Sequence, residues 1–195
     1  MRRILLATVA AVVAVGLIAG SAGAAKHHKS KARGAAAANI TDLRLTPSNA
    51  QLAACMPHAR VKVTVKSTTD ELGFDKFKVR ARGLPANTDF TVFLLETAGS
   101  PFGAAEYIGD ITSNKHGVAN NTFRLIVDEA FSSTLVNGQR VRVDLNRVGM
   151  WFADPADDDF CPAAPGVNGV TPFDGDNEAG VQAFNSANTQ PLPLP

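Results

Sequence analysis

The sequence predicts an all-β fold, a single antiparallel β-sandwich of Ig-like or jelly-roll-like type, for this chain of 195 residues. Apolar and polar residues alternate with a period of two in several short segments, which is typical of half-buried strands. Clusters of Gly, Pro, Asn and Asp separate these segments, as turns do in all-β proteins. Seven or eight such segments follow one another, about as many strands as a sandwich domain uses.

The domain organisation follows from changes in composition. Residues 1–24 predict a secretory signal peptide, because Met1-Arg2-Arg3 precedes an apolar run and Ala22-Gly23-Ala24 forms a cleavage site. The apolar run is a little short for a membrane span of roughly 20 residues, so we expect cleavage after Ala24 and no membrane span afterwards. Residues 25–39 contain no large apolar side chain and predict a disordered basic linker.

We expect the β-sandwich to cover residues 40–182, including an acidic loop segment at 154–178, and a flexible tail to cover 183–195. The expected strands are, in order, 40–45, 60–66, 75–82, 88–95, 105–111, 121–127, 140–146 and a last one in Met150–Ala153. The run 88–95 is apolar on both faces and predicts a central strand. Residues 114–117 predict a turn, and 128–135 is the one helical possibility.

The alternation also predicts which side chains form the core. We expect burial of Val61, Val63, Val65, Phe77, Val79, Phe90, Val92, Leu94, Phe123, Leu125, Val141, Val143 and Leu145.

The two cysteines, Cys55 and Cys161, predict a disulfide, because exported proteins with two cysteines usually pair them. Two separate buried thiols are the alternative. A bridge across about 100 residues would stabilise the fold by roughly 4–5 kcal/mol in the chain-entropy model.

The charge of the chain bears on the kind of partner that the protein binds. After removal of Arg2 and Arg3 the chain has 17 basic and 18 acidic residues, a net charge of about −1, which argues against a nucleic-acid-binding protein. Several cations nevertheless fall on the outward phase of their strands: Lys62, Lys76, Lys78, Arg80, Arg82, Arg140 and Arg142. These cations form either an ordinary solvated sheet face with protected edges or a binding surface for an anionic wall or surface polymer.

The segment 154–178 is the candidate site for chemistry. It follows the only Trp, Trp151, and its acids are Asp154, Asp157, Asp158, Asp159, Asp174, Asp176 and Glu178. Closely spaced carboxylates suit calcium, although residues 174–185 depart from an EF-hand loop at Ala179 and Asn185. The candidate calcium ligands are Asp154, Asp157, Asp159, Asp174, Asp176 and Glu178. The alternatives are that these acids neutralise the basic strand faces or serve a secreted hydrolase.

Other catalytic and metal-binding patterns are missing from the sequence. It has no G-x-S-x-G motif, no H-E-x-x-H motif and no Cys/His cluster with zinc-ligand spacing. His58 and His116 are the histidines beyond the linker that a catalytic triad would need, and each is more simply a loop residue. We therefore name no catalytic residue and expect no required cofactor.

Cleavage after Ala24 would create a second candidate metal site. The new amino terminus would be Ala25-Lys26-His27, whose amine, two backbone amides and imidazole form a square-planar set of four nitrogens. That set suits Cu(II) or Ni(II). The alternative is that these residues simply belong to a solvated linker.

Two stretches carry a resemblance. Residues 80–94 and 107–119, with W-F-A-D-P-A-D-D-D-F-C and F-D-G-D-N-E-A-G further on, resemble a family of secreted bacterial β-sandwich proteins with no assigned activity. The resemblance implies the fold and an exported location, and no functional residue comes with it. Together these observations predict a secreted or cell-envelope protein, a monomer without catalytic machinery, which acts as a binding or structural module, with an envelope polymer or protein as the expected partner. A secreted hydrolase and a calcium- or copper-binding protein are the alternatives.

Overall fold

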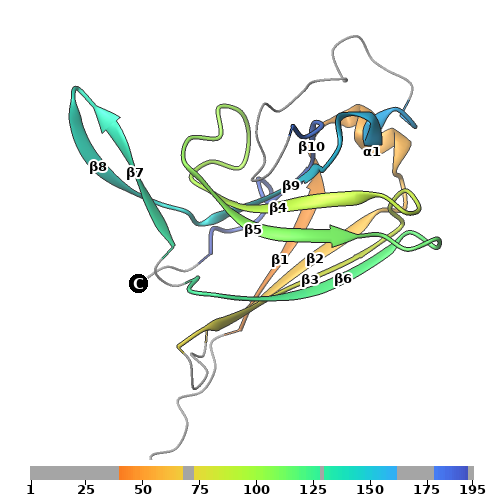
Figure 1. Ribbon diagram of the computed structural model, residues 1–195, viewed down its shortest axis with the longest axis horizontal. Coiled ribbons are helices and arrows are strands. Elements are labelled where there is room, and N and C mark those ends of the chain that lie inside the picture. The colour runs from red at the N-terminus through yellow and green to blue at the C-terminus, as the bar shows by residue number, and fades with distance from the viewer. Residues whose placement is uncertain (1–39, 68–72, 128–129, 162–177, 193–195) are drawn as a thin grey trace, which may run out of the picture. The chain divides into compact units, whose positions relative to one another are not determined.

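The structure is a computed structural model that describes residues 40–67, 73–127, 130–161 and 178–192 (Figure 1). All of these residues belong to one compact unit, Ala35–Pro195. The expected signal peptide at 1–24 and linker at 25–39 lie outside the described residues. In the part of the chain that the structure describes, no helix has the length and apolar character needed to cross a membrane.

Just over half of the described residues lie in strands and very few lie in helices, which confirms the all-β class. The strands are β1 (Ile40–Pro47), β2 (Arg60–Lys66), β3 (Asp75–Arg82), β4 (Asp89–Leu95), β5 (Ala105–Thr112), β6 (Val118–Leu125), β7 (Phe131–Val136), β8 (Gln139–Asp144), β9 (Arg147–Phe152) and β10 (Gln182–Asn185). A short helix α1 (Ala50–Cys55) and a 3₁₀ turn η1 (Pro155–Asp158) complete the elements. β2 and β3 have the predicted bounds, and β6 begins three residues before the predicted 121.

Eight strands form one antiparallel sheet in the order β5-β4-β9-β10-β1-β2-β3-β6. The sheet is nearly closed into a barrel, because its two edge strands, β5 and β6, approach each other. There the side chain of Asn121 donates to the carbonyl of Asp110, 3.1 Å away. Gly109 permits this approach: its φ is 145°, and a Cβ there would lie 2.6 Å from Phe123 Cε1. The predicted sandwich of two sheets is not confirmed.

β10 joins the two parts of this sheet, and it lies where the sequence predicted a flexible tail. It pairs with β9 through Gln182, Phe184 and Asn185 and with β1 through the last two of these. All four β10 residues are buried, and so is Leu192 further on. The expected flexible tail at 183–195 therefore differs from the structure over 183–192. Its polar composition hid three residues of β10, two of which, Phe184 and Asn185, are held by strand pairing on both sides.

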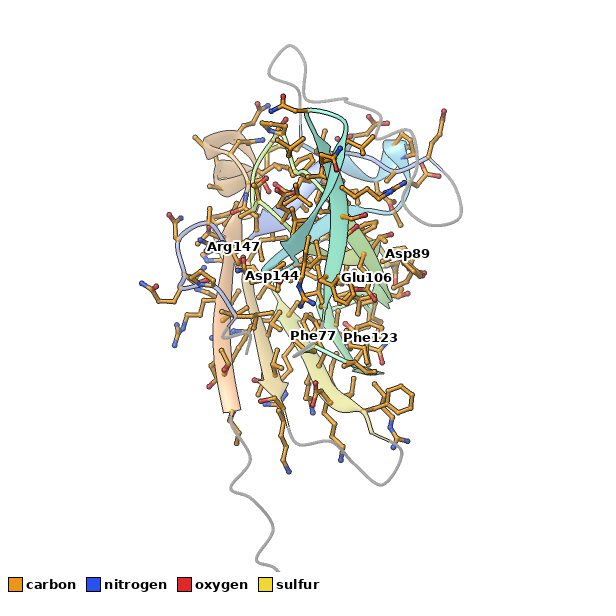
Figure 2. All side chains as sticks on the ribbon, turned by 90° about the vertical axis from the view of Figure 1, so that its left-hand side faces the viewer. Phe77, Asp89, Glu106, Phe123, Asp144 and Arg147 are labelled. Atoms are coloured by element: carbon orange, nitrogen blue, oxygen red, sulfur yellow. A yellow bond between two sulfur atoms is a disulfide. The ribbon has the colours of Figure 1, made fainter. Side chains whose placement is uncertain are left out.

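The core fills the inside of the curled sheet. The predicted core is confirmed for the inward residues of β2, β3 and β4 and for Leu145. Phe123 and Leu125 on the edge strand β6 are partly buried against it. Figure 2 shows Phe123 beside Phe77 of β3, with ring centroids 6.4 Å apart. Apolar alternation therefore located the core correctly on the interior strands β2, β3 and β4, whereas the predicted core included no residue of the interior strands β1, β9 and β10.

The β7–β8 hairpin is the main exception. It forms its own two-stranded sheet and projects from the rest (Figure 1). Val141, predicted to be buried, is 43% exposed, and Val143 is only half-buried. The helical possibility at 128–135 is wrong for the described residues 131–135, which belong to β7. Alternation identified β8 but not β7, and it predicted burial of Val141 wrongly, because a strand can alternate without a second layer packed on it.

The disulfide between Cys55 and Cys161 is confirmed, and both cysteines are bonded in it. It links the end of α1 to the turn that follows η1. Helix α1 begins after Asn49, whose side-chain oxygen accepts from the amide of Leu52 at 2.8 Å. Leu52 is fully buried in the core. The bridge is compatible with an oxidising compartment.

Candidate functional site

A cationic face covers the outside of β1, β2, β3 and β6. We use this name for the outward side chains of these four strands, whose inward neighbours form the core. The cations on it are Arg44, Arg60, Lys62, Lys66, Lys76, Lys78, Arg80, Arg82 and Arg124. Asp42 is the one exposed acid on these four strands, since Asp75 is buried. Alternation concentrates the charge, because every second residue of a strand points to the same side.

The strand register places like charges directly opposite one another. Five cross-strand pairs consist of two cations: Arg44–Lys62, Lys62–Arg80, Arg60–Arg82, Lys66–Lys76 and Lys76–Arg124. Directly opposed like charges destabilise a sheet, and each such pair works against the roughly 0.2–1 kcal/mol that a favourable pair contributes. Folding alone gives no reason for five of them.

Edge protection does not explain these cations either. Charged side chains protect edge strands from pairing with other chains. β2 lies between β1 and β3, and β3 lies between β2 and β6, so both are interior strands. Seven of the nine cations belong to these two strands. The predicted alternative was an ordinary solvated sheet face with protected edges, and its edge-protection part therefore fits β6 but not β2 or β3.

A groove of about 790 Å³ lies at one end of the cationic face. Its charged lining consists of Arg44, Arg60, Lys62, Arg80 and Arg82. Polar Thr46 and Asn120 also line it, and no acidic side chain does. Four of the five cations in the groove are arginines, whereas three of the four cations outside it are lysines: Lys66, Lys76 and Lys78, with Arg124 as the fourth.

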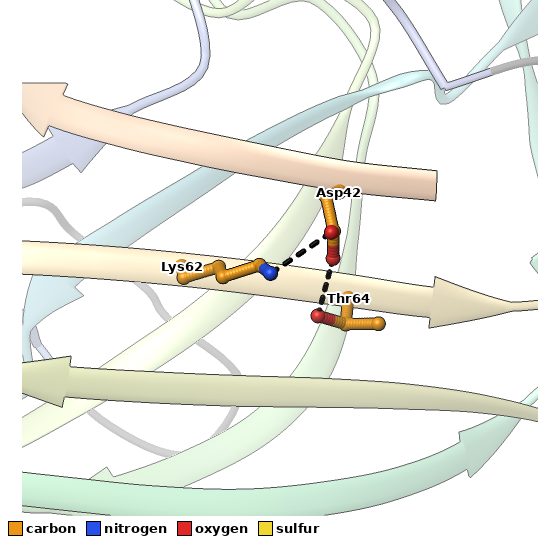
Figure 3. Close-up of polar contacts among 3 residues, drawn as sticks. All are labelled: Asp42, Lys62 and Thr64. Atoms are coloured by element: carbon orange, nitrogen blue, oxygen red, sulfur yellow. Dashed lines mark hydrogen bonds and ion pairs between the residues drawn. The ribbon is translucent and has the colours of Figure 1, made fainter. Parts of the chain in front are cut away.

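One cation of the groove is already paired. Lys62 Nζ lies 2.8 Å from Asp42 Oδ2, and the hydroxyl of Thr64 donates to the other carboxylate oxygen at 2.6 Å (Figure 3). The hydrogen bond from Lys62, followed by that from Thr64, lowers the pKa of Asp42 below its usual 3.8. Asp42 therefore stays ionised and neutralises part of the charge of Lys62.

The remaining groove arginines are available to a ligand to different degrees. Arg60 folds back, and its Nη1 donates to the carbonyl of Ala59 at 2.6 Å and to that of Pro57 at 3.3 Å. Arg44, Arg80 and Arg82 are exposed and make no ion pair within residues 40–67, 73–127, 130–161 and 178–192. Arg80 and Arg82 therefore face the groove without an acid from the described chain, whereas Arg44 lies near enough to Asp42 to interact with its carboxylate.

The outer face of β4 and β9 is built differently, because another part of the chain covers it. Trp151 is 4% exposed and packs edge-on against Phe93 and Phe102, with ring centroids 5.2 and 4.9 Å away. Phe102 belongs to the loop 96–104, and the carbonyl of Ala98 in that loop accepts from Gln182. A Cβ at Gly149 would collide with the Trp151 ring. Trp151 is therefore a structural residue of a second small core.

The acids of the predicted site 154–178 are only partly within the described chain. Asp154 caps η1, its Oδ1 accepting from the amide of Ala156 at 2.7 Å. Asp159 and Glu178 are exposed, and Asp174 and Asp176 lie outside the described residues. Over the described ranges, no ion pair joins these acids to a Lys or Arg of β1, β2, β3 or β6. The idea that they neutralise the basic strands gains no support from the described residues.

Asp158 is the most unusual of these acids. Its side chain is fully buried, and neither carboxylate oxygen makes a hydrogen bond to any residue that the structure describes. Desolvation, with repulsion from Asp159, raises its pKa above 3.8, and desolvation likewise raises the pKa of the half-buried Asp157. A fully buried carboxyl cannot touch a substrate, so this feature does not make η1 a hydrolase site.

No metal centre forms within the described residues, where no three His, Cys, Asp or Glu side chains lie together as ligands. The calcium hypothesis needs Asp174 and Asp176, and the copper hypothesis needs Ala25, Lys26 and His27; all five lie outside the described residues. Both hypotheses stay predictions.

The sequence predicted the outward direction of five of the nine cations on the cationic face, but not the other four. Lys62, Lys76, Lys78, Arg80 and Arg82 were predicted to point outward, and they do. Arg140 and Arg142 lie instead on the projecting hairpin, on β8. Arg44, Arg60, Lys66 and Arg124 were missed; the same alternation would have found them, but only the register shows that they join the other five.

Comparisons with known proteins found no matching family model, no matching curated protein and no matching solved structure.

Proposed function

We propose that this chain is an exported, non-catalytic binding module of the cell envelope or extracellular space, and that the cationic face binds an anionic polymer. The observation that carries the proposal is the set of five like-charge pairs, which lies mainly on the interior strands β2 and β3. A surface that costs folding stability is expected where it serves binding.

The shape and charge of the face favour a polymer over a small anion. The nine cations span four neighbouring strands, and strands lie about 4.8 Å apart with outward residues about 6.6 Å apart along each strand. A small anion would contact one or two of these positions. A linear polyanion contacts many of them, and it also gains from the summed field of the face, which steers association.

The proposed exported location is supported by the disulfide and by the expected signal peptide at 1–24. The resemblance to secreted bacterial β-sandwich proteins supports the same location. Asp158 is fully buried and out of a substrate's reach, whereas Asp154, Asp159 and Glu178 are exposed. The secreted hydrolase therefore stays the alternative to the binding module.

Binding of an anionic polymer to the purified mature protein tests the proposal. Fluorescence anisotropy with a labelled polyanion should give an affinity that falls steeply with salt, since exposed charges are screened beyond about 8 Å at physiological ionic strength. Replacement of Arg44 and Arg80 by Gln should weaken binding about tenfold.

The matched control is Arg140→Gln with Arg142→Gln, which removes two exposed cations from the β8 hairpin. It should leave the affinity within about twofold of the wild type. Equal losses in both variants would show that net charge rather than the cationic face governs binding. A wild-type protein that binds no polyanion at low salt would contradict the proposal outright.

A further inference from the structure

We infer that the groove recognises phosphate groups of a base-free phosphate polymer through its arginines, while the lysine-rich end of the cationic face attracts the polymer without selecting it. The inference rests on the proposed function and adds the class of ligand and a division of labour. It starts from the segregation of cation types: Arg44, Arg60, Arg80 and Arg82 line the groove, and Lys66, Lys76 and Lys78 lie outside it.

Arginine and lysine differ in what they recognise. A guanidinium presents a rigid planar fork of N–H donors that binds two oxygens of one oxyanion at once, whereas an ammonium is a compact, strongly hydrated point charge. A cluster of forks therefore selects the geometry of a ligand, and a cluster of ammonium groups senses mainly its charge. The two ends of the face thus carry two different kinds of contact.

The placement of the free arginines favours a tetrahedral oxyanion. Arg80 and Arg82 lie two residues apart on one side of β3, and Arg44 lies on β1, two strands away. A planar carboxylate offers both its oxygens to a single fork. A phosphate in a polymer keeps two non-bridging oxygens, whose lone pairs point to several sides of a tetrahedral centre, so two guanidinium groups can bind it together. Phosphate oxygens are also stronger hydrogen-bond acceptors than those of sulfate esters, which favours phosphate over sulfate.

The ion pair between Lys62 and Asp42 limits where a phosphate can bind in the groove. Lys62 lies between Arg44 and Arg80 in the same cross-strand row, and Asp42 partly neutralises its charge. The Asp42 carboxylate repels a second anion next to it. The free forks of Arg80 and Arg82 are therefore the main phosphate-binding groups, and Arg44 binds a separate phosphate on the other side of the ion pair.

The outward positions of β1, β2, β3 and β6 include no aromatic side chain: besides the nine cations they are Ile40, Asp42, Thr46, Thr64, Val118, Asn120 and Thr122. Proteins that hold single-stranded nucleic acids stack bases on aromatic rings, with about 1–3 kcal/mol for each base. Phe74, just before β3, is half-buried, and its ring centroid lies 6.0 Å from the guanidinium of Arg124, which is outside the groove. The groove lining itself has no aromatic side chain to offer that contact. The polymer is therefore recognised by its phosphates, and nucleobases add no affinity.

A charge-conserving exchange of cation types tests this inference. The probe is labelled inorganic polyphosphate, titrated with the full-length mature protein at several salt concentrations. Arg80→Lys with Arg82→Lys keeps the charge and removes both forks, so the affinity should fall about tenfold while its salt dependence is retained. The matched control on the same strand is Lys76→Arg with Lys78→Arg, for which a change of less than about twofold is expected. Thermal melting of both double variants serves as the check that they fold.

Three competing polymers complete the experiment. Polyglutamate and dextran sulfate at matched charge should displace labelled polyphosphate only at a higher concentration than unlabelled polyphosphate needs. Oligo(dT) at matched charge should displace it no more effectively than unlabelled polyphosphate does. Equal affinity for polyglutamate or for dextran sulfate would overturn phosphate selection. Clearly tighter binding of oligo(dT) would overturn base-free recognition.

The two proposals fail in different ways. If the Arg80/Arg82 lysine variant binds like the wild type while the Arg44/Arg80 glutamine variant loses affinity, the phosphate inference is overturned and the proposed function stands. If the wild type binds none of the four polymers, the proposed function itself fails and this inference fails with it.

Discussion

The two halves of the eight-stranded sheet use their outer faces in opposite ways. On β1, β2, β3 and β6 the outer face is bare and carries nine cations. On β4 and β9 the outer face is covered by the loop 96–104 and holds Trp151 in a second small core. β4, β5 and β9 together contain three acids, Asp89, Glu106 and Asp110, and one cation, Arg147. Figure 2 labels Asp89 and Glu106 on this side and Arg147 at the start of β9.

The contrast between the two outer faces shows how a small sheet can leave one face available for a ligand. The covered half gains stability from apolar packing on both of its faces. The cationic half packs only inward and loses stability through its opposed like charges. The two halves share one core and are joined through β10 and the disulfide. Stability is therefore concentrated in one half, and the exposed charge in the other.

The largest effect is expected from the bridge that joins the two halves. Replacement of Cys55 and Cys161 by Ala should lower the free energy of unfolding by about 4–5 kcal/mol, because the bridge closes a loop of 106 positions. Chemical denaturation of both proteins measures the change. Non-reduced wild type should be two hydrogens lighter than the reduced form. A double variant as stable as the wild type would show that the halves need no covalent link.

The shared core should give the next largest effect. Phe90 is fully buried and packs on Phe152, with ring centroids 5.1 Å apart. Phe90→Ala should cost about 3–5 kcal/mol. The control is Val141→Ala on the exposed β8, which should cost less than about 0.5 kcal/mol. Similar losses at the two sites would mean that the hairpin also belongs to the core.

The outer faces themselves can be compared directly. Trp151→Ala should cost about 3 kcal/mol although Trp151 points outward, because the loop 96–104 buries it. Arg80→Ala on the cationic face should change the free energy of unfolding by less than about 0.5 kcal/mol, or stabilise the protein slightly by removing a like-charge pair. A large loss for Arg80→Ala would assign the cationic face to folding rather than to binding.

The smallest effects concern pH, and they should have opposite signs in the two halves. Asp158 has a raised pKa, so the folded protein binds its proton more tightly than the unfolded chain; this stabilisation is complete below pH 3.8 and is lost as the pH rises through the raised pKa. Asp42 has a lowered pKa, so its stabilisation is present above pH 3.8 and is lost as the pH falls through the lowered pKa.

Melting curves between about pH 3 and pH 7 test both signs. Asp158→Asn should gain stability relative to the wild type as the pH rises, because the variant buries no charge. Asp42→Asn should be less stable than the wild type near neutral pH and should approach it in acid. An Asp158→Asn variant whose difference from the wild type does not change with pH would contradict the assignment of Asp158 as a buried carboxyl.

Particular residues show which parts of the fold could be predicted from the sequence and which could not. The Val–Lys–Val alternation of 60–66 and the Phe–Lys–Val alternation of 75–82 located β2 and β3 and gave the inward and outward sides correctly. Helix α1 was missed, although Asn49 before an Ala-rich run is a helix start signal. β10 was missed because Gln182–Asn185 has no alternating pattern, since all four of its residues are buried.

The sequence by itself determined the all-β class, the inward and outward sides of the main strands and the pairing of two cysteines. These follow from local chemistry, because a strand alternates every two residues and two cysteines allow one bridge. The tertiary structure alone decided that four separate basic strands become neighbours, that β10 joins the sheet and that Trp151 is covered. Each of these depends on register and on contacts between distant segments, which one-dimensional alternation does not encode.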